Sequence, residues 1–339
     1  MPLTTEQLRQ ISIVAWADIA NDFRGADLLL GNGFSLYLNE LFRYDSLFER
    51  FLANCTQAEA DTFRQFQTTN FEYILESLMN ASKVNTIYGI GNQPIHEAAE
   101  KLKEGLITTV SQNHPRAADL NRAHLTRISE IFDLFSDIFT LSYDALLYHV
   151  IMISLDRSRL NNNVRPYSDY FWGPYDDQFL QFMTSQNIQR YKRIYYLHGA
   201  LFIFRLVATT VKIRRTNDTE LLELIENQIH EGNVPLFVSE GTSEDKQFAI
   251  SRSEYLQFAN NHLKRCLNRL VVYGASLSRP DAHIVEAIRT PQRRIAISVR
   301  VGDKSEDNLR AEIIEHRRRF PNQGLYFFDS TTLFVLDGI

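Results

Sequence analysis

The stretch DLLLGNGFS, residues 27–35, decides the fold, because an apolar run breaks here into Gly31, Asn32 and Gly33 and continues with Phe34 and Ser35. A buried strand that ends in a glycine pair lets the backbone turn tightly and approach a phosphate at the start of the next helix. GNGFSL lacks the third glycine of the GxGxxG fingerprint. By itself the stretch therefore favours a plain strand-to-helix turn at least as much as a dinucleotide site.

Further apolar runs along the chain repeat this strand pattern. They are rich in Val, Ile, Leu, Phe and Tyr with little polar alternation, which is typical of strands covered on both faces. Most of them pass into helical patterns, and this alternation predicts an α/β fold with a doubly wound, mostly parallel sheet. The predicted strands span residues 26–30, 138–141, 194–197, 235–238, 270–273 and 295–299.

Helical periodicity accounts for much of the remaining chain. In NFEYILESL, the residues Phe71, Ile74, Leu75 and Leu78 recur at i, i+3, i+4 and i+7, which places them on one inward face. Comparable patterns predict helices over 145–155, 220–230, 255–270 and 307–320, the last ended by Pro321. We expect a single α/β domain over 1–339, with helical or loop insertions at 81–130 and 157–190 that form a small lobe or a lid.

Composition excludes several classes of function. Lys and Arg number 36 against 41 for Asp and Glu, a net charge of −5 that gives no broad reason to bind nucleic acid. Cys55 and Cys266 have no partners at metal-ligand spacing, so the sequence predicts neither a metal site nor a disulfide framework. No signal peptide or membrane-spanning run is present in the sequence, and we expect a cytoplasmic protein.

Small or polar residues follow four of the predicted strands. Because ligands bind at the carboxyl ends of strands in open α/β sheets, these residues are expected to share one nucleotide pocket. Each also has an ordinary structural interpretation, since Asp144 and Asp281 can cap helices and a single histidine such as His198 is usually structural. Besides the glycine turn, the candidates are Ser142, Asp144, His198, Gly274, Ser276 and Asp281.

The ordered motifs GNGFS, SYD, LHG and YGASLSRPDAHI resemble those of the sirtuin-like NAD-binding fold. Together with NFEYILESL and PLFVSEGTSEDK, they resemble the bacterial family described as domain of unknown function 4917 over residues 26–290. The resemblance implies a Rossmann-like fold and an NAD site. Gly31, Gly33 and Ser35 would hold the pyrophosphate, Asp144 would lie near the nicotinamide carboxamide, and His198 would match the catalytic histidine. Gly274 and Ser276 would contact the adenosine half, and Asn32, Phe34 and Asp281 complete the expected cofactor-binding set.

Sirtuin-like proteins divide into protein deacylases and NAD hydrolases, the latter common in bacterial anti-phage defence. This sequence lacks the paired-cysteine zinc module of the deacylases, so the resemblance implies a hydrolase that releases nicotinamide and ADP-ribose. It also implies a homo-oligomer and a partner protein of a defence system. Ser142 stands where the family carries a catalytic Asn, and a hydroxyl offers less hydrogen-bonding capacity than an amide. The alternative is therefore a module that binds NAD or ADP-ribose and acts through protein partners.

Overall fold

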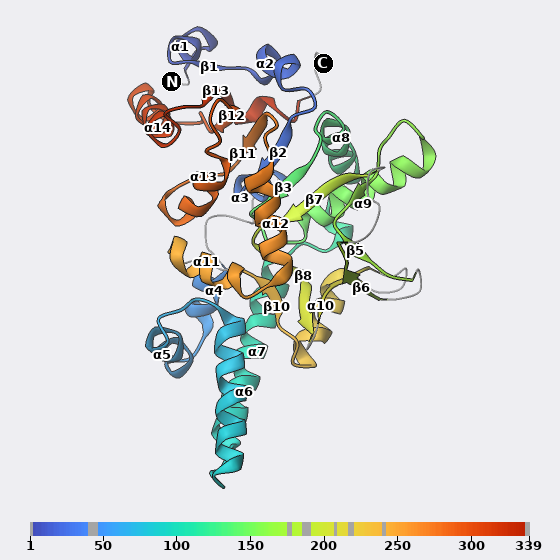
Figure 1. The fold of residues 1–339 in the computed structure, drawn as a ribbon, viewed down its shortest axis with the longest axis vertical. Coiled ribbons are helices and arrows are strands. Elements are labelled where there is room, and N and C mark those ends of the chain that lie inside the picture. Colours follow the sequence, from blue (N-terminus) through green and yellow to red (C-terminus); the bar gives the residue numbers. More distant parts are fainter. Residues whose placement is uncertain are drawn as a thin grey trace.

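A large parallel sheet and a smaller antiparallel sheet form the centre of the protein, and a long helical hairpin extends from them (Figure 1). The computed structural model describes residues 3–39, 47–174, 178–184, 191–206, 209–215, 220–238 and 242–335. The hairpin consists of α6 (Phe71–Ile87) and α7 (Gln93–Asn113).

The large sheet has eight strands, each parallel to its neighbours. From its central strand β2 the chain adds β3 and then β7 on one side, and later adds β11, β12 and β13 on the other side. The order of the strands therefore reverses between β2 and β11. In spatial order the strands are β1 (Ile13–Val14), β13 (Gly324–Asp329), β12 (Arg294–Val299), β11 (Leu270–Tyr273), β2 (Asp27–Leu30), β3 (Ile138–Thr140), β7 (Lys192–Tyr196) and β4 (Tyr167–Ser168).

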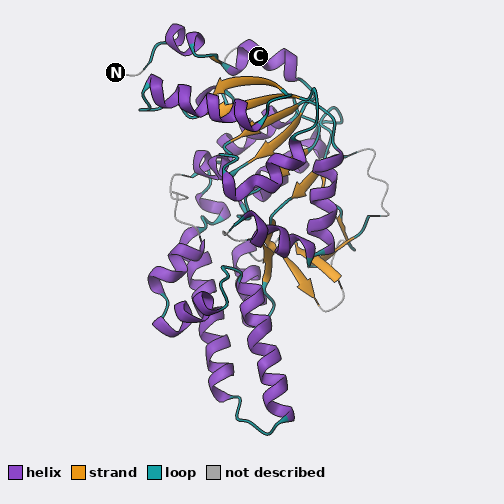
Figure 2. Cartoon of the chain, turned by 60° about the vertical axis from the view of Figure 1, so that its left-hand side comes forward, coloured by secondary structure: helices purple, strands orange, loops and turns teal. Residues whose placement is uncertain are grey.

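Helices cover both faces of this sheet (Figure 2). Side chains alternate along each strand, so Leu28 and Leu30 belong to one apolar cluster while Leu29 belongs to the other. The first cluster includes residues of α2 (Trp16–Phe23), α8 (Arg122–Phe132) and α9 (Leu146–Leu160). The second includes residues of α12 (Glu254–Arg265), α13 (Ala282–Ile288) and α14 (Glu306–Arg319). The prediction of an α/β fold with a mostly parallel sheet is confirmed.

The small sheet is antiparallel and was not predicted. Its order is β10 (Pro235–Phe237), β8 (Gly199–Leu206), β9 (Thr209–Ile213), β6 (Phe179–Phe182) and β5 (Phe171–Trp172). The assignment of the apolar run 235–238 to the parallel sheet is therefore wrong. A short apolar run is buried equally well in either kind of sheet, so its composition does not distinguish them.

Two sequence predictions need correction at their boundaries. The helix expected over 255–270 ends at Arg265, because Leu270 begins β11 and Leu267 is exposed. The segment 157–190 was expected to lie outside the sheet, yet β4 within it pairs with β7. The remaining helices agree with their predictions to within a few residues, among them α10 (Leu221–His230).

Further helices surround the base of the hairpin. They are α4 (Leu47–Asn54), α5 (Gln57–Gln65) and α10, of which α4 and α10 contact α7. The segment 81–130 contains the outer part of the hairpin and most of α8, which packs against α9. The other helices are α1 (Thr5–Gln10), α3 (Asn32–Leu38) and α11 (Ser243–Ser251). Over the described ranges, none of the helices combines the length and the apolar character needed to cross a membrane.

Candidate functional site

The glycine turn after β2 lies directly against the loop that follows β11. The amide groups of Gly31 and Gly33 donate to the carbonyls of Tyr273 and Gly274, each at 2.8 Å. A Cβ on Gly33 would lie 2.6 Å from the Gly274 Cα, and one on Gly31 would lie 2.5 Å from the Gly274 carbonyl oxygen. The glycines are thus required by a close contact between two backbones, at the point where the strand order reverses. Their amide groups are bonded to these carbonyls within the protein.

The remaining residues of the turn divide between core and surface. Phe34 is buried, and its ring packs against those of Phe132 and Phe334 at centroid distances of 5.8 Å. The Phe34 side chain therefore belongs to the apolar core. Asn32, the first residue of α3, is exposed.

Three predicted polar residues meet where β2 and β3 end. The hydroxyl of Ser35 donates to the carboxylate of Asp144 and lies 3.4 Å from the hydroxyl of Ser142. The other carboxylate oxygen of Asp144 accepts from the amide of Leu146 at 2.8 Å, at the start of α9. Asp144 thus bonds to the beginning of a helix and also joins the turn after β2 to the loop after β3. All three side chains are buried.

His198 occupies the junction between the two sheets, directly after β7 and before β8. Gly199 follows it with φ +72°, and a Cβ there would lie 2.0 Å from the carbonyl oxygen of Leu236 in β10. This glycine allows the chain to pass from one sheet to the other. Burial, nearby Lys246 and His283 hold the pKa of His198 well below its usual range, although the backbone carbonyl of Leu141 opposes them. His198 is therefore neutral at physiological pH.

His283 and Ser243 complete the surroundings of His198, and neither residue was among those predicted from the sequence. The Nε2 atoms of His283 and His198 are 3.0 Å apart, and His283 Nδ1 lies 3.3 Å from the hydroxyl oxygen of Ser243. Burial lowers the pKa of His283 to about 4 against the opposing effect of Asp281, and Lys246 and Lys264 lower it further. The sequence held one signal for this contact, because the capping box of Thr242 and Asp245 marks the start of α11, where Ser243 lies.

The loop after β11 ends in an ion pair. Asp281 stands at the N-cap position of α13, but its side chain makes no capping bond there and instead pairs with Lys246 of α11 at 2.7 Å. Ser276 is exposed, and its hydroxyl lies 3.1 Å from that of Ser278. Between them, buried Leu277 has φ +48°, a conformation that costs a non-glycine residue on the order of 1 kcal/mol. Arg319 donates to its carbonyl at 2.6 Å.

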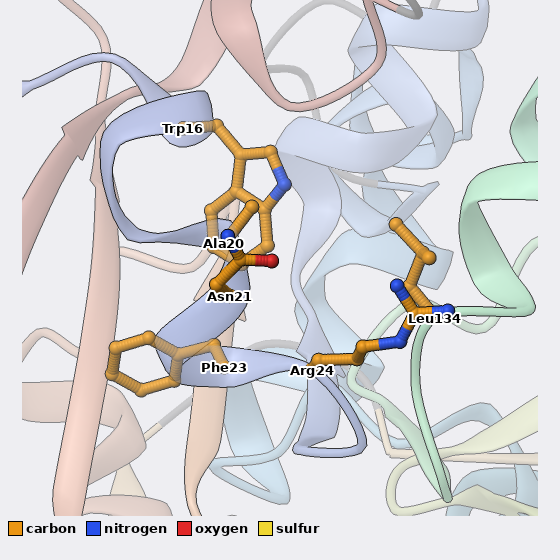
Figure 3. A pocket seen from close by; sticks show the side chains of 6 residues that line it. All are labelled: Trp16, Ala20, Asn21, Phe23, Arg24 and Leu134. Carbon is orange, nitrogen blue, oxygen red and sulfur yellow. The ribbon is translucent and has the colours of Figure 1, made fainter. Parts of the chain in front are cut away.

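The hollow drawn in Figure 3 lies at the opposite edge of the sheet. It is lined by Trp16, Ala20, Asn21, Phe23, Arg24 and Leu134. Arg24 precedes β2 and Leu134 precedes β3, so the hollow lies beside the amino ends of these strands. None of the predicted site residues lines it. The candidate site is therefore the cluster of side chains at the carboxyl edge and not this hollow.

Comparison with known families places the whole of this arrangement within one family. Residues 28–335 match the model of the family described as domain of unknown function (DUF4917). The chain belongs to this family. The DUF4917 match includes the small sheet, the helical hairpin, every site residue described above and the large sheet except for β1 and the first residue of β2. No curated protein matches the chain. The family description names no activity, so the geometry of the DUF4917 site is the basis for a functional proposal.

Proposed function

We propose that this protein binds NAD at the carboxyl edge of the large sheet and hydrolyses its nicotinamide–ribose bond, releasing nicotinamide and ADP-ribose. One observation carries the proposal: the loops after β2, β3, β7 and β11 converge there. Gly33 contacts Gly274, Ser35 contacts Asp144, and His198 contacts His283 beyond the loop after β11. Ligands of open α/β sheets bind at such an edge, where the strand order reverses.

The strand order adds support for a dinucleotide. Numbered along the chain, β2, β3, β7, β11, β12 and β13 lie side by side in the order 3-2-1-4-5-6. This is the order of the Rossmann dinucleotide-binding fold. The resemblance of GNGFS, SYD, LHG and YGAS to the sirtuin-like motifs supports NAD among the dinucleotides.

The reaction sets requirements that these residues can meet. The bond between the nicotinamide nitrogen and C1′ of the ribose breaks, nicotinamide leaves as a neutral molecule, and a water oxygen bonds to C1′ and releases a proton. The transition state resembles an oxocarbenium ion, which a nearby carboxylate stabilises. In the proposal, Asp144 supplies this charge, Ser142 holds the water, and neutral His198 orients the ribose and accepts the proton.

Two further features of the site fit the ligand. Tyr143 follows Ser142 in the chain, and Phe237 pairs with Gly199, the residue after His198. The centroids of their rings are 5.2 Å apart, and in the proposal these rings offer an apolar wall for a flat ring. Asn32 and Ser276 are exposed next to the glycine contact and are the residues we assign to the phosphates and the adenosine ribose. Gly31 and Gly33 then act by keeping the two loops together.

A second candidate function is binding without turnover. In the structure, the polar side chains of the site are bonded to one another: Ser35 to Asp144, and His198 to His283. Ser142 replaces the Asn that the sirtuin-like hydrolases use. These observations favour a module that binds NAD or ADP-ribose and acts through a partner protein, such as a further component of a defence system.

The deciding experiment is incubation of the purified protein with NAD, followed by chromatography of nicotinamide and ADP-ribose. Wild type is expected to form both products, and His198→Ala is expected to lose at least a hundredfold in rate, as for a general base. His230→Ala is the matched control, because His230 is exposed on α10. Undiminished product from His198→Ala would refute the role of His198. Product from Ser142→Asn alone, together with NAD binding by wild type, would favour the binding module.

A further inference from the structure

A chain of hydrogen bonds connects Ser243, His283 and His198, which come from α11, α13 and the end of β7. Ser243 Oγ lies 3.3 Å from His283 Nδ1, and the two Nε2 atoms lie 3.0 Å apart. The exposed fractions of the three residues are 7%, 6% and 4%, so water does not compete for these contacts. The proposed function uses His198 alone, and the other two residues have no role in it.

The contact between the two rings pairs one donor with one acceptor. A neutral imidazole carries one proton, so one of the two facing Nε2 atoms donates and the other accepts. On the other side of His283, the hydroxyl oxygen of Ser243 accepts the backbone N–H of His283 at 3.1 Å and lies against Nδ1 of the same residue. Ser243 therefore holds the His283 ring in place.

This arrangement occupies Nε2 of His198 with the His283 ring. A ribose hydroxyl can reach that nitrogen only by replacing His283 as its partner. The exchange is inexpensive, because a hydrogen bond between neutral groups contributes only about 1 kcal/mol net.

We propose that His283, oriented by Ser243, occupies the reactive nitrogen of His198 in the resting protein, and that a substrate hydroxyl takes its place. His283 is then a positioning residue that holds Nε2 of His198 and competes with the substrate. This inference rests on the proposed function for the identity of the substrate, but the contact between the two rings does not depend on it.

The test compares His283→Gln with His283→Met, two side chains of similar length. The Gln amide can still form a hydrogen bond with His198 Nε2, as donor or as acceptor, whereas Met cannot donate one. The first measurement is nitrogen NMR of isotope-labelled histidine, with the His198 signals identified by their loss in His198→Ala. We expect the His198 Nε2 signal to agree between wild type and His283→Gln and to move in His283→Met. An Nε2 signal that stays unchanged in His283→Met would overturn the inference.

The second measurement is calorimetric titration with NAD. Without the competing ring, His283→Met should bind NAD about fivefold more tightly than wild type, which corresponds to the ~1 kcal/mol of the lost hydrogen bond. His283→Gln should stay close to the wild-type affinity. Equal or weaker binding by a folded His283→Met would contradict the competition. If no form binds NAD while the NMR result holds, the proposed function and the competition with NAD both fail, and only the contact between the two rings stands. Thermal unfolding of each variant verifies the fold.

Discussion

His283 is a buried base that the folded protein keeps neutral. Its pKa is lowered to about 4, first by burial and then by Lys246 and Lys264, while Asp281 opposes the shift. In the unfolded chain the His283 side chain takes up a proton near pH 6.5, whereas in the folded protein it does so only near pH 4. The contribution of His283 to stability is therefore complete above pH 6.5 and decreases as the pH falls toward 4, by about 3 kcal/mol in total.

Replacing His283 by Gln should remove this loss. As the pH falls from 6.5 to 4, the free energy of unfolding should decrease by about 3 kcal/mol less in His283→Gln than in wild type. The measurement is urea denaturation of both proteins at a series of pH values. His149 on α9 is the matched control, because it is also buried with a pKa lowered to about 4. His149→Gln should change the pH dependence in the same way and leave the His198 Nε2 signal as it is. Parallel stability curves for wild type and His283→Gln would contradict the argument.

At the scale of elements, the contact between the turn after β2 and the loop after β11 holds the two halves of the large sheet together. Gly33→Ala would place a Cβ 2.6 Å from the Gly274 Cα, and backbone atoms cannot move aside as a flexible side chain does. We expect a loss of about 2 kcal/mol in the free energy of unfolding, measured by urea denaturation. Gly91→Ala is the control, since nothing lies within 4 Å of its added Cβ. A Gly33→Ala protein as stable as wild type would show that the two loops separate readily.

The elements differ in how clearly the sequence encodes them. Strands β2, β3, β7, β11 and β12 could be predicted because apolar runs covered on both faces leave a direct signal. β13 was not predicted, although its sequence GLYFFD is also apolar, and the small sheet depends on pairings between distant segments that no local pattern encodes. Ser142, Asp144 and His198 could be named as candidates because they follow predicted strands. His283 was not predicted because it lies in a helix next to Ile284, and the sequence of a helix does not distinguish a buried histidine of a site from a buried residue of the core.

At the scale of the whole molecule, the helical hairpin is the most prominent feature outside the sheets (Figures 1 and 2). At its outer end the chain turns at Gly89, which has φ +66°. Two hydrogen bonds order this turn: Ile90 N–H donates to the carbonyl of Asn85 at 2.8 Å, and the side chain of Asn92 donates to the carbonyl of Ser82 at 3.0 Å. Nevertheless this end carries apolar side chains that the chain leaves uncovered. The exposed fractions are 78% for Ile87, 76% for Tyr88 and 56% for Ile90.

These side chains contribute little to folding, and we expect them to contribute to contacts between copies of the chain. Residues 77–99 contain two formally charged side chains, Lys83 and Glu97, whose charges cancel, so this end offers little attraction to nucleic acid or to an anionic membrane. A neutral apolar surface that is not needed for the fold is typical of an interface with a similar surface. The homo-oligomer expected from the sequence would then form through the hairpin.

The variant that combines Ile87→Ser, Tyr88→Ser and Ile90→Ser tests this expectation. Because the three side chains are mostly exposed, its free energy of unfolding should stay within about 0.5 kcal/mol of wild type. In sedimentation velocity over a concentration series, wild type should associate and the variant should remain a monomer. Leu160→Ser with Leu267→Ser is the control, since these leucines are 90% and 73% exposed but lie outside the hairpin. A monomeric wild type, or a hairpin variant that associates as wild type does, would show that the outer end of the hairpin serves another purpose.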